Sequence, residues 1–441
     1  MFPLRRNSNC SRCYHKLAVE RPTHKRIVQR ITDYYLGSRD FNGYPVGLLR
    51  EDFGMTLDEI RSLLGVLVRR GRITLVMPET DVNPHIKRVS ELPKQRQLEL
   101  LPKTDLARTC AYPSRSYLNR HVDRAEYRKR PFALQLALGH PQLEHKAFDL
   151  SVLEFYRNDP RYYYRTDDIS GSIRVRQKYA RRLRKGARIL LETFGFAYDR
   201  KLNRVVGVLL RYLAGLSYEH QQIWCTKMLH GRHHLHPDYF RSAVIGEWHE
   251  GIFIFQAFIE ELRIINVMCR LIGRPPLFKE DFHDRERPKR FGFLIRPTLA
   301  EFSEFVHLLD KMMSDNVDKS FFGGEVVPEI EYRRKDGRIE VRPRGTIQML
   351  DEWLSLNFRA PNRAPIDEMI NTFKSVRKLR HKPAHTVSED VFDQKYFKEQ
   401  RELMIPGYQA VRTLRLVLAS DPKAQGCAVP SVLVKGRIWT Y

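Results

Sequence analysis

The first part of the chain carries apolar residues at helical spacing. Within residues 23–36 they recur on one helix face, so a helix is expected there. A short segment at residues 44–50 is followed by Phe53 and Gly54, which predict a helical turn closed by glycine. Thr56 and Glu59 then fit a capping box, in which each side chain satisfies a backbone donor of the other residue. The helix that begins there carries a continuous apolar face and is expected to stop at Gly71.

Two strands are expected after these helices, one at residues 72–76 and a return strand near residues 86–89. Helix, short helix, capped helix and a two-stranded wing within residues 21–91 resemble a winged helix-turn-helix domain. The resemblance implies that the second helix of the turn enters the major groove of DNA and that the wing touches phosphates. The cations available to a nucleic acid there are Arg61, Arg69, Arg70 and Arg72. The alternative is a winged helix used for packing or for protein contact.

The middle of the chain is predicted to be a basic helical domain over residues 114–296. A linker at residues 92–113, rich in Lys, Pro, Gln and Arg, separates it from the winged helix, and residues 1–20 form a polar leader. Apolar residues have helical spacing in three segments of this middle region: 148–156, 208–216 and 247–272.

The last part of the chain, residues 297–441, is predicted to be a helical bundle. An Asp-Gly pair at Asp336 and Gly337 lies between alternating segments, which predicts a β-hairpin over residues 330–341. Helices are expected after it at residues 346–356, 365–381 and 391–419. The fold class expected from the whole pattern is therefore mainly α and multidomain, with the hairpin inserted in the C-terminal bundle.

One short motif in this bundle carries a chemical prediction. Arg380, His381 and His385 match the pattern of the HEPN (higher eukaryotes and prokaryotes nucleotide-binding) family, whose ribonucleases carry Arg, a polar residue, three variable residues and His. The resemblance implies a bundle of four or five helices that dimerises, places two motifs across a cleft, and cuts RNA without metal. It also implies that His385 is the general acid or base, that Arg380 holds the scissile phosphate, and that His381 assists.

The residue types suit this reaction independently of the family. Histidine titrates near neutral pH, so one imidazole can take a proton from a 2′-hydroxyl and another can return one to the leaving oxygen. Arginine keeps its charge and offers several donors to a pentavalent phosphate. Because Pro383 disfavours helical backbone at Lys382, the helix is expected to kink or end inside the motif.

The charge of the chain narrows the class of partner. Its 441 residues include 77 Lys or Arg and 52 Asp or Glu, which gives a formal net charge of +25. Such a charge favours polyanions such as nucleic acid or an anionic membrane surface. No apolar stretch is long enough to span a bilayer. Six scattered cysteines and the lack of an apolar core behind the basic N-terminus are typical of a cytoplasmic protein.

The densest run of cations predicts a contact with phosphates. It comprises Arg174, Arg176, Lys178, Arg181, Arg182, Arg184, Lys185 and Arg188. Tyrosines alternate with arginines just upstream, at residues 161–165, a combination typical of surfaces that bind single-stranded nucleic acid. The alternative is a solvated basic helix face with the tyrosines in the core.

Two further clusters contain residue types that can bind a metal ion. Four histidines lie within residues 230–236, and they are compatible with a metal, with phosphate contact, or with ordinary packing. Cys10 and Cys13 form only half of a zinc site. We expect neither a metal nor another cofactor, and no phosphate-binding GxxxxGK[ST] or GxGxxG motif is present.

The function predicted from these observations is a metal-independent endoribonuclease of the HEPN type, acting at a composite dimer site. The resemblance implies a toxin or an anti-phage defence effector, with an inhibitory partner that the sequence does not identify. The alternative is a non-catalytic regulator, in which the winged helix binds DNA and the C-terminal bundle only dimerises.

Overall fold

The computed structural model describes residues 23–38, 40–88, 91–167, 169–247, 251–282, 287–334, 336–359, 361–381 and 389–440. These residues form two compact units. The first unit runs to Tyr127 and also includes Ala133–Glu144, and the second is formed by Arg128–Phe132 and by the chain from His145 onwards. Each unit is described by itself below.

The first unit begins with the helices that the apolar pattern predicts. They are α1 (His24–Gly37), α2 (Leu48–Phe53) and α3 (Leu57–Arg69). The capping box at Thr56 and Glu59 is confirmed, since each side chain accepts a hydrogen bond from the backbone N–H of the other residue. Gly71 adopts a φ of 61°, which lets the chain leave α3 and enter the next strand.

A three-stranded antiparallel sheet completes the first unit. Its strands, in the order β1-β3-β2, are β1 (Tyr44–Pro45), β2 (Ile73–Val76) and β3 (Cys110–Pro113). The strand that returns beside β2 is β3, so the return strand expected near residues 86–89 is wrong. Pro84 and His85 instead form a turn, and the buried Lys87 after it lies outside any strand. Residues 92–113 supply this central strand and α4 (Lys94–Leu100).

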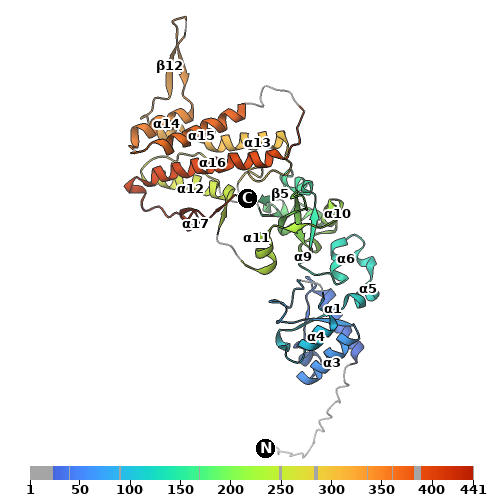
Figure 1. Cartoon of the computed structure of the whole chain (residues 1–441). Coiled ribbons are helices and arrows are strands. Elements are labelled where there is room, and N and C mark those ends of the chain that lie inside the picture. Colours follow the sequence, from blue (N-terminus) through green and yellow to red (C-terminus); the bar gives the residue numbers. More distant parts are fainter. Residues whose placement is uncertain are drawn as a thin grey trace, which may run out of the picture. The chain divides into compact units, whose positions relative to one another are not determined.

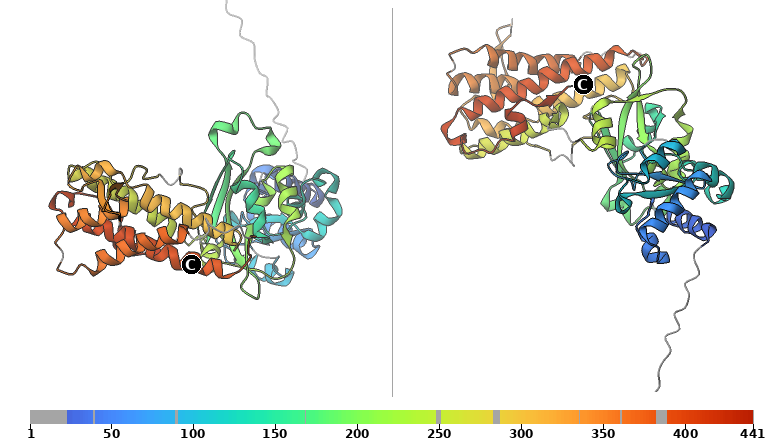
Figure 2. Two further views of the ribbon diagram at one scale, coloured as in Figure 1. Left: turned by 90° about the horizontal axis from the view of Figure 1, so that it is seen from above. Right: turned by 60° about the horizontal axis from the view of Figure 1, so that its bottom comes forward.

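The middle of the chain, in the second unit, is built on a seven-stranded antiparallel sheet (Figures 1 and 2). The path β5-β6-β7-β8-β4-β9 is extended by β10, which pairs with β7. The strands are β4 (His145–Phe148), β5 (Tyr162–Thr166), β6 (Ser170–Val175), β7 (Leu190–Tyr198), β8 (Arg204–Leu209), β9 (Met228–Leu229) and β10 (His234–Leu235). Helices make up 50% and strands 16% of the structure. The prediction of a mainly α fold with a helical middle region is therefore wrong, and the protein is mixed α/β.

The error has a physical cause. Val205 to Leu209 in β8 are all buried, so this strand has apolar side chains on both faces and no alternation along the sequence. A short continuous apolar run cannot be distinguished from a buried helix by periodicity. The helical spacing assigned to residues 208–216 joins the end of β8 to the short helix α9 (Leu210–Ala214).

The helices and short strands around this sheet are small. In the second unit they are α7 (Glu154–Arg157), α8 (Gln177–Ala180), α10 (Tyr218–Thr226) and α11 (Pro237–Phe240). Three further short helices lie elsewhere: α5 (Arg115–His121) belongs to the first unit, α6 (Pro131–Ala137) is divided between the two units, and Leu433 of α17 (Ser431–Val434) belongs to the core of the C-terminal helices. β11 (Ile252–Phe253) pairs in parallel with β14 (Ile438–Trp439).

The C-terminal part of the second unit is a bundle of long helices (Figure 1). They are α12 (Ile254–Leu271), α13 (Leu299–Asp310), α14 (Thr346–Asn357), α15 (Ala364–His381) and α16 (Lys395–Ala419). α16 packs on both α12 and α15, and one apolar core joins all five helices. The predicted hairpin is confirmed as β12 (Glu329–Arg333) and β13 (Ile339–Pro343). Within the described ranges, no helix is long and apolar enough to cross a membrane.

Candidate functional site

The HEPN-like motif lies where α15 ends. The structure describes α15 as far as His381, and Pro383, from which a kink or helix end is expected, lies outside the described residues. His385 lies outside the described residues, as does the side chain of His381. Of the three motif residues, Arg380 is the one whose side chain the structure describes.

The Arg380 guanidinium is held by two carboxylates from the end of α13 and the turn after it. Its Nη1 lies 2.7 Å from Oδ2 of Asp310 and 2.6 Å from Oδ2 of Asp315. Arg377, one helical turn earlier, binds the same pair: its Nε is 3.2 Å from Oδ1 of Asp310, and its Nη2 also contacts Asp315. Two cations and two anions therefore form one network, which we call the Arg380 cluster: Arg377, Arg380, Asp310 and Asp315.

Burial and charge set the protonation of this cluster. The Asp310 side chain is fully buried, whereas that of Asp315 is 41% exposed. Partial burial opposes ionisation of Asp315, but its contacts with Arg380 and Arg377 outweigh this effect and hold its pKa below the usual range. The hydrogen bonds to Asp310 and Asp315 in turn raise the pKa of Arg380. Asp315 and Arg380 are therefore ionised at neutral pH.

The geometry leaves part of Arg380 available. Both of its hydrogen bonds to carboxylates within the described residues use Nη1. Because a guanidinium has five N–H donors, Nε and Nη2 can still donate to another anion. The two aspartates thus orient the arginine through one nitrogen and leave the other two for a phosphate.

A histidine that the sequence did not single out lies next to this cluster. His307 is on α13, one helical turn before Asp310, and its side chain is partly buried. Burial, together with the positive charges of Arg380 and Lys311, lowers its pKa. The imidazole is therefore neutral at pH 7 and able to accept a proton. The three-residue spacing of His307 and Asp310 is the signal that could have drawn attention to it.

The predicted basic run forms an exposed loop on the sheet. It begins in β6, continues through α8 and ends before β7, where the left-hand view of Figure 2 shows it projecting in green. Of its eight cations, Arg176 is half-buried and the other seven are exposed. Arg184 pairs with Glu219 at 3.3 Å, but the described residues 169–191 contain no acidic residue. The loop therefore carries a concentrated positive charge.

The tyrosines beside this loop differ from one another in accessibility. Tyr162 and Tyr164 are 1% and 5% exposed, so they belong to the core and cannot stack on bases. Tyr163 points to the opposite face of β5, where the guanidinium of Arg174 lies 4.6 Å from its ring centroid. Two of the three rings thus agree with the alternative interpretation, in which the tyrosines pack in the core and do not bind nucleic acid.

In the first unit, the cations predicted to meet DNA have internal partners. The Arg61 guanidinium donates to the carbonyl groups of Leu101 and Thr104, at the end of α4, and is only partly exposed. Arg70 lies 3.1 Å from Nδ1 of His24, and Arg72 lies over the ring of Tyr117. Arg69, also exposed, completes the set. The contacts of Arg61 stabilise the packing of α4 on α3.

The histidine cluster is used in local structure. His236 is buried, and its Nδ1 accepts the backbone N–H of Asp238 at the start of α11. The carbonyl of His233 lies 2.9 Å from Nε2 of His145. Among the residues that the structure describes, no group of three His, Cys, Asp or Glu side chains is arranged to hold a metal ion. Cys10 and Cys13 lie outside the described residues.

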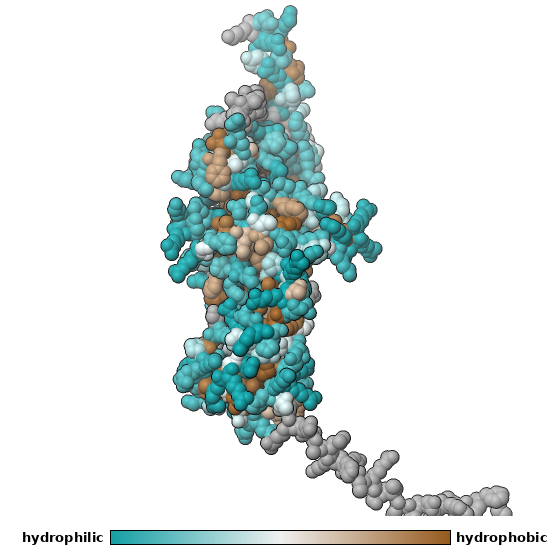
Figure 3. Space-filling model, turned by 90° about the vertical axis from the view of Figure 1, so that its right-hand side faces the viewer, coloured by the Kyte–Doolittle hydropathy of each residue, from teal (hydrophilic) through white to brown (hydrophobic). Residues whose placement is uncertain are grey.

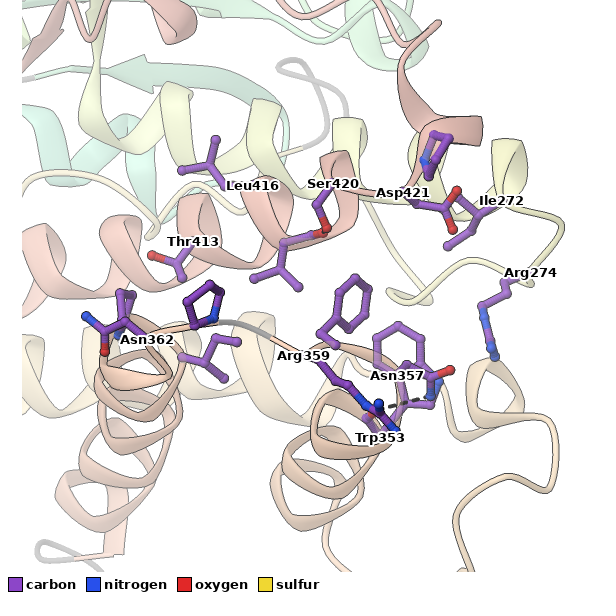
Figure 4. A pocket seen from close by; sticks show the side chains of 16 residues that line it. Ile272, Arg274, Trp353, Asn357, Arg359, Asn362, Thr413, Leu416, Ser420 and Asp421 are labelled. Atoms are coloured by element: carbon purple, nitrogen blue, oxygen red, sulfur yellow. Dashed lines mark hydrogen bonds between the residues drawn. The ribbon is translucent and has the colours of Figure 1, made fainter.

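The bundle also contains a groove of about 810 Å³, lined by residues from α14, α15 and α16 (Figure 4). Its walls combine apolar side chains such as Phe358 and Leu416 with the charged Arg359 and Asp421. Arg274, at one end, lies 5.0 Å from the ring of Trp353 and is paired with Glu325. None of the residues predicted to be functional lines this groove.

No protein-family model matches the chain, and neither a curated protein nor a solved structure matches it. The functional argument therefore depends on the residues and geometry described above.

Proposed function

We propose that this protein is a metal-independent endoribonuclease. Arg380 would hold the scissile phosphate, His385 would transfer the proton as general acid or base, and His381 would assist. Histidine and arginine supply proton transfer and charge stabilisation without a metal ion. By its resemblance to HEPN ribonucleases, the site is proposed to be composite, with two copies of the motif in a homodimer that acts as a toxin or an anti-phage effector in the cytoplasm.

The observation that most supports this proposal is the state of Arg380. A buried carboxylate is costly unless it is paired, and Asp310 is paired by two arginines of α15. This arrangement fixes the direction of Arg380 next to the start of the His-Lys-Pro-Ala-His segment while leaving Nε and Nη2 for a phosphate. A preoriented cation at that position is what stabilisation of a developing negative charge requires.

The basic loop supports RNA as the substrate. Seven exposed cations without a neighbouring acid in the loop can follow a phosphate backbone, as in proteins that bind single strands. Tyr163 is the one tyrosine of the three that faces outward, and it already carries Arg174 on its ring. Binding through this loop would therefore depend on charge more than on base stacking.

A non-catalytic nucleic-acid-binding regulator is the second candidate. The basic loop supports this regulator as much as it supports the ribonuclease, since a protein can bind phosphates without catalytic residues. The environment of Arg61 does not favour base recognition by α3, because its guanidinium is engaged with the end of α4. Cleavage separates the two candidates.

The test is incubation with total RNA in the presence of a chelator. We expect the wild-type protein to cleave, and Arg380→Ala and His385→Ala to abolish cleavage. Lys378→Ala is the matched control, because Lys378 is an exposed cation on the same turn of α15. Loss of wild-type activity in chelator would contradict a metal-independent mechanism. Full activity in both motif variants would disprove the site, and binding without cleavage by the wild type would favour the regulator.

A further inference from the structure

The β12–β13 hairpin is an exposed element that lacks a covering layer among the described residues. It stands out from the bundle at the top of Figure 1, and in Figure 3 apolar residues lie among hydrophilic ones at the top of the molecule. Tyr332 is 52%, Val341 54% and Ile339 64% exposed. A two-stranded hairpin is marginally stable in water, and its free edges are templates for pairing with another strand.

The hydrogen-bond register shows which groups point away from the hairpin. The Arg334 N–H donates to the Arg338 carbonyl, and the Arg344 N–H donates to the Pro328 carbonyl. In an antiparallel ladder, hydrogen-bonded pairs alternate with non-hydrogen-bonded pairs. Counting between these two hydrogen bonds, Tyr332 with Glu340 and Ile330 with Arg342 are also hydrogen-bonded pairs, and the pairs that separate them are not.

It follows that the backbone N–H and C=O groups of Ile339 and Val341 point outward along the edge of β13. The corresponding outward positions in β12 are Glu329, Glu331 and Arg333. All three are charged, which is a common protection of an edge strand. The β13 edge instead presents Ile339 and Val341, two β-branched apolar residues that favour strand pairing, and Pro343, which has no N–H and offers only its carbonyl to a neighbouring strand.

We propose that β13 pairs antiparallel with β13 of a second copy of this chain, about a two-fold axis at Val341. The two Val341 residues would then face each other as a hydrogen-bonded pair, and Ile339 would face Pro343 of the second copy. Glu340 would lie opposite Arg342 of the second copy, so the edge is complementary in charge to itself. The same operation on β12 about Glu331 would place two carboxylates face to face.

This surface has a direct connection to the Arg380 cluster. The hairpin leads into α14, whose Thr346 hydroxyl donates to the Ser314 carbonyl at 2.8 Å. The next residue, Asp315, binds Arg380. The pairing deepens the proposed function, since it supplies the second copy that a composite site needs. As an assembly surface, however, it can be tested without RNA.

The experiment is sedimentation velocity of the full chain over a range of concentrations. We expect a dimer for the wild type. Val341→Lys should raise the dimer dissociation constant about tenfold or more, because like charges directly opposite are unfavourable. Tyr332→Lys on β12 is the matched control and should leave the dimer unchanged. Because both side chains are exposed, the unfolding transition of each monomer should be unchanged.

A charge exchange makes the register testable. In the proposed dimer, residue 340 of each copy faces residue 342 of the other. Glu340→Arg would place an arginine opposite an arginine at both of these pairs, and Arg342→Glu would place a glutamate opposite a glutamate. Each variant alone should therefore be monomeric. Mixing the two variants should restore a dimer, because each new residue then faces its opposite charge.

A monomeric wild type, a Val341→Lys dimer as tight as that of the wild type, or dissociation by Tyr332→Lys alone would overturn the proposal, as would a mixture that stays monomeric. If the dimer behaves as expected but no RNA is cleaved, the proposed ribonuclease fails while this interface stands. If RNA is cleaved by a monomer, the interface fails while the ribonuclease stands.

Discussion

The Nη1 nitrogen of Arg380 lies 2.7 Å from Oδ2 of Asp310. This carboxylate is fully buried, and the two residues are 70 positions apart in the chain. The pair links α13 to the carboxyl end of α15. It also fixes the direction of Arg380, the motif arginine that is proposed to bind a phosphate. The same ion pair therefore stabilises the fold and orients a proposed site residue.

Replacement of Asp310 should destabilise the bundle more than replacement of Asp315. Asp310→Ala leaves two partly buried guanidinium groups with one carboxylate, and we expect a loss of about 1–3 kcal/mol in the free energy of unfolding. Asp315→Ala removes a half-exposed group and should cost about 1 kcal/mol or less. Urea unfolding followed by circular dichroism measures both. Equal losses would show that the burial of Asp310 does not matter.

The buried pair between Glu261 of α12 and Arg415 of α16 should respond strongly to removal of one partner. The two side chains are 0% and 5% exposed. Arg415→Ala would leave a buried carboxylate without its main partner, at a cost of about 3–5 kcal/mol. The double variant Glu261→Leu/Arg415→Met should recover much of this loss, because no charge remains buried. Thermal unfolding of both variants tests this, and a double variant less stable than the single one would contradict it.

Stability should fall as the pH is lowered through the range of His220. Trp224 donates to the Tyr156 hydroxyl at 3.0 Å, and that hydroxyl lies 2.9 Å from Nδ1 of His220, to which it can donate when the imidazole is neutral. Burial lowers the pKa of His220 below 6.5. The unfolded chain thus binds a proton at a pH where the folded chain does not, so stability is lost as the pH falls from about 6.5 to the folded pKa.

The measurement is the free energy of unfolding between pH 5 and 8 for the wild type and for His220→Gln, the range in which histidine titrates. We expect a smaller slope in the variant. A slope that is unchanged would mean that this imidazole is protonated equally in the folded and unfolded states.

The basic loop should control the salt dependence of RNA binding. Replacement of Arg181, Arg182, Arg184 and Lys185 by glutamine should weaken binding to all sequences and reduce the log-log salt slope by roughly 0.7 per lost phosphate contact. Base preference should hardly change. The control is the same replacement at four exposed cations of the bundle and its C-terminal extension: Lys398, Arg401, Lys423 and Lys435. If both variants change the slope equally, only net charge matters.

Several local elements could be predicted because their determinants lie within a few residues of one another. The capping box joins Thr56 to Glu59, and the hairpin depends on the turn at Asp336 and Gly337. Each of these depends on backbone sterics or on a hydrogen bond between near neighbours. The charge of the basic loop is likewise a property of consecutive residues.

The sheet and the Arg380 cluster could not be predicted in this way. β4 pairs with β8 and β9, which are distant in sequence, and β8 is buried on both faces, so neither register nor alternation is visible in the chain. His307, Asp310 and Asp315 become site residues only because α13 packs against α15. Sequence alone therefore determined the local elements named above and the charge of this protein. Tertiary structure decided the sheet and which carboxylates hold Arg380, because both exist only after distant segments exclude water together.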